Sequence, residues 1–184
     1  MSLPNFSVCV YCGSRPGADP AYLATAQALG AAIATNHWRL VYGAGDVGLM
    51  GAVAQAATDA GAPTLGIIPM HLLDREAPRG VFGDRIITET MHERKKVMFM
   101  NADAVIVLPG GAGSLDEFFE VLTWAQLGLH AKPIVLLNVN GYWDPLLALL
   151  DHVIEKAFAD VSIRGFFRTV ATVDEAVAEL GATN

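Results

Sequence analysis

Short runs of apolar residues recur along this chain, and they constrain its fold more than any other feature. A strand with one solvated face alternates apolar and polar residues, whereas a strand that is buried on both faces is apolar almost throughout. These runs show little alternation, so we expect them to be strands of a sheet that is covered on both sides. They are Phe6–Tyr11, Leu40–Tyr42, Thr64–Ile68, Ala104–Leu108 and Pro133–Leu137.

Longer segments with helical character separate these runs. They are Pro20–Asn36, Leu49–Asp59, Ser114–Leu127 and Tyr142–Ala157. Asp19 followed by Pro20 is typical of a helix start, because aspartate caps the first turn and proline fits its first position. Alternation of strands and helices indicates parallel strands joined by helical crossovers. The sequence therefore predicts an α/β fold, a Rossmann-like, doubly wound, mainly parallel sheet with helices on both faces, in a single domain spanning residues 1–184.

The composition excludes several classes of protein. Of the 184 residues, 53% are hydrophobic and 17% are charged, which excludes a disordered chain. The formal net charge of −7 argues against a binder of nucleic acid or of membrane surfaces. Because the start of the sequence resembles no signal peptide, and no segment reads as a membrane span, we expect a cytoplasmic protein. The low charge content also suggests that a second copy buries part of the surface.

The first of two glycine-rich turns is Gly43-Ala-Gly-Asp-Val-Gly48, which has the G-x-G-x-x-G spacing of dinucleotide-binding proteins. Those proteins also carry an acidic residue at the end of the next strand. Here Asp59 comes too early and Asp74 lies beyond that strand, which weakens the hypothesis of a dinucleotide-dependent oxidoreductase. Two interpretations stay open, a tight turn lining a nucleotide site and simple packing of strand against helix.

The second turn, Pro109-Gly-Gly-Ala-Gly-Ser-Leu-Asp-Glu117, joins a strand to a helix. Backbone N–H groups at such a helix start can hold an anion. The turn lacks the Gly-Lys-Ser/Thr of nucleoside triphosphatases. Ser114 and Glu117 also have the spacing of a capping box, in which both side chains only satisfy backbone donors. From spacing alone, the capping role is favoured for Glu117.

A basic helix, Met91–Met98, precedes the Ala104–Leu108 strand. Arg94 lies on the same helical stripe as Met91 and Met98, which predicts that it faces inward. A buried guanidinium needs a partner, so we expect a carboxylate, with Glu117 as the candidate, or the phosphate or ribose of a ligand. Lys96 is expected to be solvated and Lys95 is not.

These two segments resemble those of the Lonely Guy (LOG) family. Residues 109–117 resemble its PGGxGTxxE motif, and Met91-His-Glu-Arg-Lys95 resembles its M-H-x-R-K segment at the matching distance upstream. The likeness extends over about residues 6–158, including the turns at Cys12-Gly-Ser14 and Tyr42-Gly-Ala-Gly45. It also includes the Thr123–Gly128 and Leu137–Tyr142 runs. Ser114 stands where the family usually has threonine, and both residues carry a hydroxyl.

The resemblance implies a phosphoribohydrolase. Such an enzyme hydrolyses the N-glycosidic bond of a nucleoside 5′-monophosphate, such as a cytokinin riboside monophosphate or AMP, and releases free base and ribose 5-phosphate. It implies no cofactor and no metal, and a homodimer. The alternative from another class is a non-catalytic nucleotide-binding module, and the pairing of Arg94 with Glu117 favours the enzyme.

The resemblance also implies roles for individual residues. Glu117 would stabilise the positive charge on the ribose and accept a proton from the attacking water, with Arg94 as its catalytic partner. The phosphate would be held by Gly110, Gly111, Gly113 and Ser114, and further substrate contacts would come from Glu76, Lys95 and Thr123.

Other chemistries find less support in the sequence. Many bacterial family members carry the label lysine decarboxylase, but no lysine here has the context of a pyridoxal phosphate site. Cys9 and Cys12 have the C-x-x-C spacing of a redox pair, but they would close a strand and point to opposite faces, which favours structural roles. The histidines show no metal-binding spacing.

Overall fold

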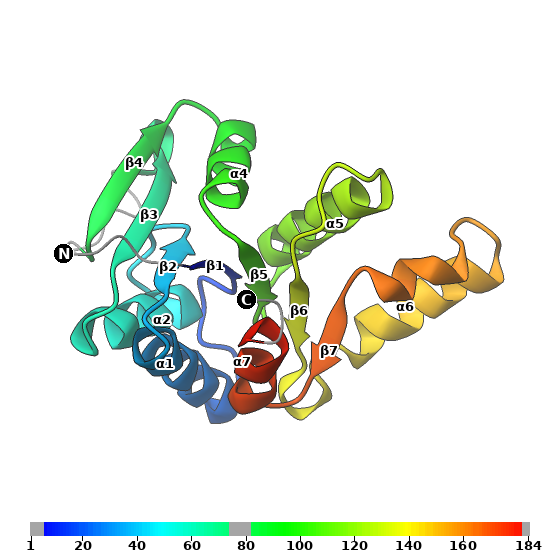
Figure 1. Ribbon diagram of the computed structural model, residues 1–184, viewed down its shortest axis with the longest axis horizontal. Helices are drawn as coiled ribbons and strands as arrows, with labels where there is room; N and C mark the ends of the chain where they lie inside the picture. The colour runs from blue at the N-terminus through cyan, green and yellow to red at the C-terminus, as the bar shows by residue number, and fades with distance from the viewer. Residues whose placement is uncertain (1–5, 74–81, 182–184) are drawn as a thin grey trace.

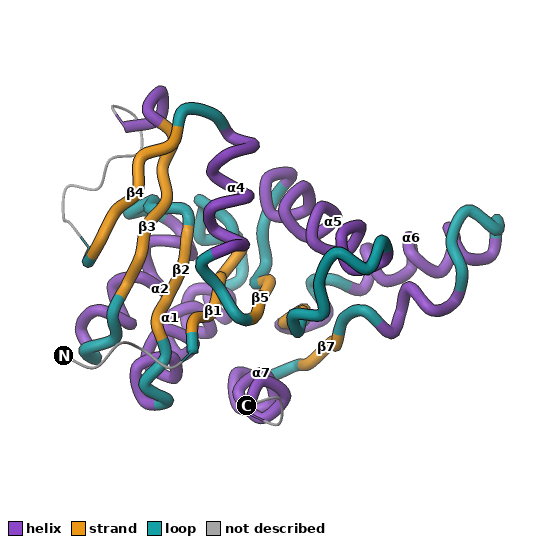
Figure 2. The backbone as a smooth tube through the Cα atoms, turned by 45° about the horizontal axis from the view of Figure 1, so that its top comes forward, coloured by secondary structure: helices purple, strands orange, loops and turns teal. Residues whose placement is uncertain are grey.

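A parallel sheet organises the computed structural model, which describes residues 6–73 and 82–181 (Figure 1). The strands run in the order β4-β3-β2-β1-β5-β6-β7. Figure 2 shows β4 toward one edge of the sheet and β7 toward the other. Every neighbouring pair is parallel. The strands are β1 (Ser7–Tyr11), β2 (Arg39–Tyr42), β3 (Thr64–Pro69), β4 (Asp84–Thr88), β5 (Ala104–Val107), β6 (Ile134–Leu137) and β7 (Arg168–Val170).

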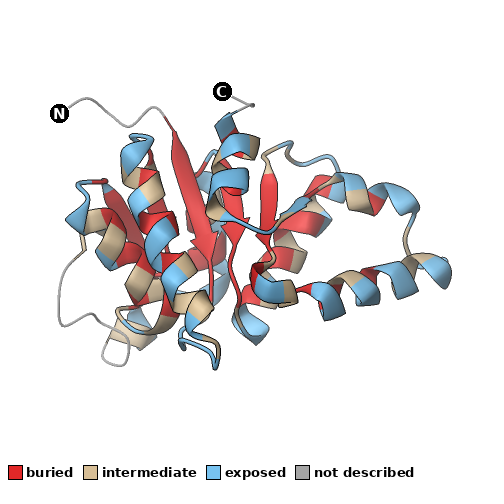
Figure 3. Cartoon of the chain, turned by 90° about the horizontal axis from the view of Figure 1, so that it is seen from below, coloured by how far each residue is buried: buried red, intermediate tan, exposed pale blue. Residues whose placement is uncertain are grey.

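Helices cover both faces of this sheet. They are α1 (Pro20–Thr35), α2 (Gly48–Asp59), α4 (Met91–Met100), α5 (Ala112–Gln126), α6 (Asp144–Glu155) and α7 (Val173–Gly181). Short 3₁₀ turns are η1 (Met70–Leu72), η2 (Val139–Gly141) and η3 (Val161–Gly165). One core lies between the sheet and α1, α2 and α7, and the other lies between the sheet and α4, α5 and α6. Figure 3 shows the buried strands between these layers.

The side chains of β1 show why the strands are apolar without alternation. Val8 and Val10 belong to one core, whereas Cys9 and Tyr11 belong to the other. Successive residues of a strand point to opposite faces, so a sheet with two covered faces needs apolar residues at every position. The predicted fold class, a doubly wound parallel sheet with helices on both faces, is confirmed.

Several element boundaries differ from the sequence prediction. The edge strands β4 and β7 were not predicted, because both are largely exposed or half-buried and lack a continuous apolar run. Helix α5 begins at Ala112, two residues before the expected Ser114. Helix α6 begins at Asp144 instead of Tyr142, because the η2 turn precedes it with Asn140 at a positive φ of 50°.

Side-chain caps set the starts of α1 and α4. Asp19 accepts a hydrogen bond from the Ala21 N–H at 2.8 Å, with Pro20 as the first helical residue, as predicted. Thr90 caps α4 in the same way by accepting a bond from the Glu93 N–H at 3.1 Å. These caps fix the register in which α4 presents its side chains.

The strand order reverses at β1, which pairs with β2 on one side and with β5 on the other. Ligands of open α/β sheets bind beyond the carboxyl ends of the strands at such a switch point. The fold therefore directs attention to the loops that follow β1 and β5. Within the ranges described, no helix is both long enough and apolar enough to cross a membrane.

Helices α1 and α2 pack closely because Gly30 has no side chain. A Cβ at this position would lie 2.4 Å from the Val53 carbonyl oxygen and 2.8 Å from the Ala57 nitrogen, and neither backbone atom can move freely. We predict that Gly30→Ala lowers the free energy of unfolding by about 1–3 kcal/mol, because overpacking outweighs the gain in helix propensity. Urea unfolding followed by circular dichroism measures this change.

Gly181→Ala is the matched control, because none of the described residues has an atom within 4 Å of a Cβ at that helical position. We expect it to leave stability unchanged or slightly raised. A Gly30→Ala variant as stable as the native protein would contradict the close packing of the two helices.

Candidate functional site

A cavity of about 460 Å³ lies at the switch point, beyond the ends of β1 and β5. Its walls come from both loops that follow these strands and from the facing turns of α2, α4 and α5. The lining residues are Cys12–Gly17, Tyr22, Leu49, Met50, Met91, Arg94, Lys95, Pro109–Ser114, Asp116, Glu117 and Tyr142. The cavity thus brings together most of the residues that the sequence singled out.

The glycine loop between β5 and α5 forms one wall, with Gly110, Gly111, Gly113 and Ser114 among its residues. Gly111 is the N-cap of α5, and no side chain caps this helix end. The capping box predicted from spacing is therefore wrong: Ser114 lies inside the first turn of α5 and not before it. The first N–H groups of a helix lack intrahelical acceptors, so this end of α5 can bind an anion.

Two hydrogen bonds hold the glycine loop in place. The Tyr142 hydroxyl donates to the Gly110 carbonyl oxygen at 2.6 Å, and the Gly13 N–H donates to the Pro109 carbonyl oxygen at 3.0 Å. Glycine is required at 110, because a Cβ there would lie 2.0 Å from the Ser114 hydroxyl oxygen. The loop is a tightly packed wall of the cavity.

Arg94 is buried, as its helical stripe predicted, with 6% of its surface exposed. We expected a carboxylate, with Glu117 as the candidate, or a ligand as its partner; among the described residues, backbone carbonyl oxygens and not a carboxylate accept its short hydrogen bonds. Its Nη2 donates to the Gly43 carbonyl oxygen at 2.6 Å, and its Nε donates to the Ile67 carbonyl oxygen at 3.1 Å. Its Nη1 has a weak acceptor, the Met91 sulfur at 3.9 Å.

The G-x-G-x-x-G turn after β2 makes room for this arginine. A Cβ at Gly43 would lie 2.0 Å from the Nη2 of Arg94, and one at Gly48 would lie 2.3 Å from the carbonyl carbon of Ser14. None of the three motif glycines lines the cavity, although Leu49 and Met50 just beyond them do. Of the two interpretations left open, close packing describes this turn.

Glu117 lies on the cavity wall, one turn into α5 and facing the region of Arg94. Burial raises the pKa of its carboxyl to about 7, although the positive charge of Arg94 acts in the opposite direction. Within the described part of the chain, its carboxylate makes no hydrogen bond or direct ion pair. A desolvated carboxylate without fixed partners is suited to bind or exchange a proton near neutral pH.

Lys95 is buried as well, whereas Lys96 is exposed, as expected. The Nζ of Lys95 lies 2.9 Å from Asp116 Oδ2 and 3.0 Å from Glu120 Oε1. Burial alone would lower the pKa of Lys95, but the hydrogen bonds to these two carboxylates raise it above the usual value. Lys95 therefore stays charged at the cavity wall.

The remaining predicted site residues are Thr123 and Glu76. Thr123 is exposed, lies further along α5 and does not line it. Glu76 lies outside the described residues. The lining residues to which the sequence analysis gave no role include Arg15, Tyr22, Met50, Asp116 and Tyr142. Tyr142 and Asp116 belong to motifs it had quoted, but spacing alone did not assign them to a site.

The two cysteines are buried on opposite faces of the sheet. Cys9 belongs to the core beside α5, and Cys12 belongs to the core beside α1. Burial raises the pKa of both thiols well above the usual value. Both are free thiols packed into the core, so the structural interpretation is confirmed. No group of three or more potential metal ligands occurs among residues 6–73 and 82–181.

Comparison with known proteins shows the family. A family model described as "Possible lysine decarboxylase" matches residues 50–180. A rice protein named as a probable cytokinin riboside 5′-monophosphate phosphoribohydrolase is 42% identical over 96% of this chain and 77% of its own length. A cytokinin riboside 5′-monophosphate phosphoribohydrolase of Arabidopsis thaliana is 44% identical over 95% of this chain and 77% of its own. Both carry LOG names.

Solved structures share the fold over nearly the whole chain. The molybdenum cofactor binding protein of Rippkaea orientalis superimposes with a TM-score of 0.75 at 25% identity, covering 99% of each chain. A molybdenum cofactor carrier protein of Chlamydomonas reinhardtii gives a TM-score of 0.70 at 22% identity, covering 97% of this chain and 98% of its own. With its sequence identity to the plant enzymes and its match to the family model, this chain belongs to the LOG family.

Proposed function

We propose that this protein hydrolyses the N-glycosidic bond of nucleoside 5′-monophosphates, a cytokinin riboside monophosphate or AMP, to free base and ribose 5-phosphate. The observation that carries the proposal is the meeting of Glu117, Arg94 and the start of α5 at one cavity. Its named relatives are phosphoribohydrolases of this kind. The geometry supplies an anion site, a fixed positive charge and a carboxylate of raised pKa.

The phosphate binds at the start of α5. Backbone N–H groups of Gly110, Gly111 and Gly113 and the hydroxyl of Ser114 are the donors, and the helix dipole favours the negative charge. This assignment places the ribose further along the cavity wall, where Glu117 follows Ser114 by one turn of helix. Lys95 and Thr123 are not needed for it.

Glu117 acts on the anomeric carbon. As the C1′–N bond breaks, its electron pair leaves with the base and positive charge develops on the ribose, which the ionised carboxylate stabilises. A water molecule then attacks C1′ and gives one proton to Glu117, which passes it to the departing base and returns to its ionised form. The sum is one nucleotide and one water converted into free base and ribose 5-phosphate.

Arg94 acts on the charge state of the Glu117 carboxyl. Two backbone carbonyl oxygens fix its guanidinium without neutralising it, and Nη1 keeps a donor whose partner is a weakly accepting sulfur. The positive charge lowers the pKa of Glu117 against the effect of burial. Arg94 therefore favours the ionised form of Glu117 and can orient a ribose hydroxyl.

The alternative is a binding module without catalysis, as in the molybdenum cofactor carriers that share the fold. A site built only to hold an anion gains nothing from a desolvated carboxylate beside it, because like charges repel. Glu117 on the wall of the cavity thus favours the enzyme.

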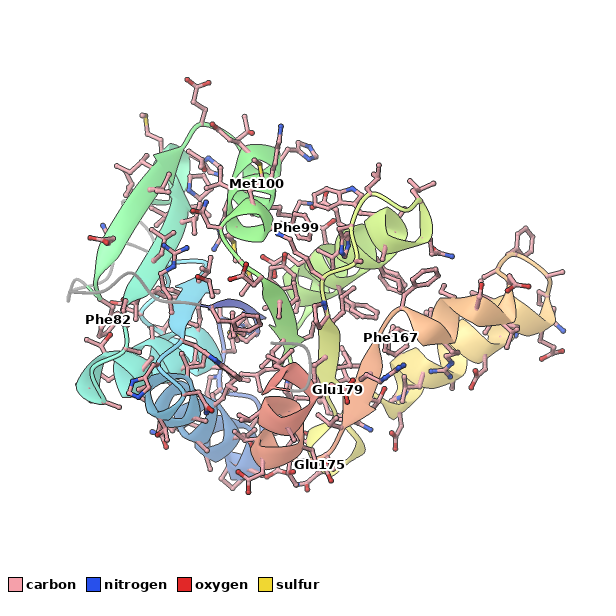
Figure 4. The ribbon with its side chains drawn as sticks, in the orientation of Figure 1. Phe82, Phe99, Met100, Phe167, Glu175 and Glu179 are labelled. Carbon is pink, nitrogen blue, oxygen red and sulfur yellow. The ribbon has the colours of Figure 1, made fainter. Side chains whose placement is uncertain are left out.

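We also propose a cytoplasmic homodimer. Exposed apolar side chains gather near the ends of α4 and α5, where Met100, Leu127 and Leu129 are each about two-thirds exposed. These helix ends lie close together, because the rings of Phe99 and Trp124 are 5.1 Å apart. Figure 4 labels Phe99 and Met100 at this end of α4. A second copy covering this surface accounts for the low charge content of the chain.

The direct test is an assay of purified protein with AMP and with a cytokinin riboside monophosphate. We expect free base and ribose 5-phosphate in equal amounts, and much slower cleavage of the corresponding nucleosides, which lack the phosphate. Binding of these monophosphates with no release of base would favour the binding module instead.

Replacement of the carboxylate separates catalysis from binding. Glu117→Gln keeps the shape of the side chain but removes the charge and the proton acceptor, so we expect kcat to fall by about 10³-fold or more. The Kd for AMP, measured by calorimetry, should change little, because the phosphate contacts remain. Glu155→Gln, on the exposed end of α6, is the control with native activity.

The pH dependence follows from the state of Glu117. Its carboxyl must be ionised to act, and its pKa is about 7. We predict that kcat/KM rises with pH and levels off above neutral pH. The midpoint of the rise should lie close to 7, and not near 4.5, the value of an ordinary glutamate. An acidic limb centred below pH 5 would show that another group limits the rate.

The carboxyl of Glu117 also lowers the free energy of unfolding above about pH 4.5. Because the folded-state pKa lies above the unfolded value of 4.5, the folded protein binds the proton more tightly, and stability falls as pH rises from about 4.5 to 7. Glu117→Gln removes this loss. We expect the variant to be more stable than the native protein at pH 8, by on the order of 2 kcal/mol, and no more stable below pH 4.5. Urea unfolding at the two pH values checks the prediction.

A further inference from the structure

The ammonium of Lys95 is enclosed between two carboxylates at the cavity wall. Its Nζ lies 2.9 Å from Asp116 and 3.0 Å from Glu120, and only 7% of its side-chain surface is exposed. The Glu120 side chain is 24% exposed and the Asp116 side chain is 61% exposed, so the half-buried pair with Glu120 is the costlier one to break. We name these three residues, Lys95, Asp116 and Glu120, the Lys95 clamp.

The clamp is adjacent to the catalytic pair on both helices. On α4, Lys95 directly follows Arg94. On α5, Asp116 directly precedes Glu117, and Glu120 lies one helical turn after it. The ion pairs of Lys95 therefore join α4 and α5 at the level where Arg94 and Glu117 have to face each other.

The clamp also supplies most of the charge around Glu117. From α5, Asp116 and Glu120 raise the pKa of Glu117, and from α4, Lys95 and Arg94 lower it. Cys9 and Tyr11 on β1, and Cys12 just after it, are held neutral, because burial raises each pKa well above the usual value. Beyond the effect of burial, the pKa of Glu117 thus depends on the charges of Arg94 and of the three members of the clamp.

Direct binding of substrate phosphate fits Lys95 less well. An ammonium group has three donors, and two of them already point to carboxylates. A phosphate placed on the third donor would lie beside Asp116 and Glu120, where like charges repel. The start of α5 offers an anion site without such neighbours in its first turn, where no acidic residue occurs.

We propose that Lys95 is a positioning residue, which locks α5 to α4 through Asp116 and Glu120 and compensates their charge so that Glu117 is ionised when it acts. This inference rests on the proposed hydrolase function for its catalytic meaning. It differs from the role in substrate contact that the family resemblance implied for Lys95.

The test compares Lys95→Met with Asp116→Asn and Glu120→Gln. Loss of the positive charge leaves two carboxylates near Glu117, so in Lys95→Met the acidic midpoint of kcat should move up by about one pH unit. Loss of either carboxylate should move it down. The KM for AMP should change less than threefold in Lys95→Met. Lys96→Met, at the exposed neighbouring lysine, is the matched control with a native profile.

A second measurement does not need turnover. The carboxyl of Glu117 can be titrated by ¹³C NMR, with its signal assigned from Glu117→Gln, and we expect the same shifts in the same directions. Opposite shifts from Lys95→Met and from the two carboxylate variants support the clamp, since a merely destabilised fold would not produce them.

The outcomes separate the two proposals. A Glu117 titration that is unchanged in Lys95→Met overturns the clamp, and a tenfold rise in KM with an unchanged midpoint assigns Lys95 to the substrate instead. If the native protein releases no base from any nucleotide while the NMR midpoints shift as expected, the hydrolase proposal fails and the clamp stands.

Discussion

The burial of one guanidinium governs the arrangement of the cavity. Arg94 reaches from α4 to the carbonyl oxygens of Gly43 and Ile67, beyond β2 and within β3, and so fixes α4 against the carboxyl ends of the sheet. Buried charges need hydrogen-bonding partners, and neutral carbonyl oxygens satisfy the donors without cancelling the charge. The positive charge of Arg94 therefore still acts on Glu117 and lowers its pKa. An ion pair at the same place would have neutralised both groups.

The fold class could be predicted from the sequence because the patterns that indicate it are local. The apolar runs of β1, β5 and β6 contain the information that both faces of the sheet are covered, and Asp19 with Pro20 marks the start of α1. The strands β4 and β7 lie at the edges, where partial exposure removes the apolar pattern. Their existence depends on pairing with β3 and β6, which is not encoded within the segments themselves.

The sequence analysis also predicted part of the site, again from local patterns. The stripe of Met91, Arg94 and Met98 indicated an inward arginine, because helical periodicity is a local property. Its partners are carbonyl oxygens of residues 43 and 67, and no side-chain pattern announces a backbone acceptor. The capping box failed because Ser-x-x-Glu spacing is the same before a helix and inside its first turn. Only the N-cap at Gly111 distinguishes the two, and it frees Glu117 from the backbone.

The charges around Glu117 explain how an acidic protein can act on an anionic substrate. In the proposed mode of binding, backbone donors at the start of α5 hold the substrate phosphate, so the site needs no excess of basic side chains. Among the described residues, the positively charged side chains that line the cavity are Arg15, which is exposed, and Arg94 and Lys95, which are buried and held by neighbours on the protein. The charges of Arg94 and Lys95 act on the nearby carboxylates, and the formal net charge of the whole chain remains −7. Burial raises the pKa of Glu117 to about 7, and the charges of Arg94 and Lys95, which lower it, are partly offset by those of Asp116 and Glu120.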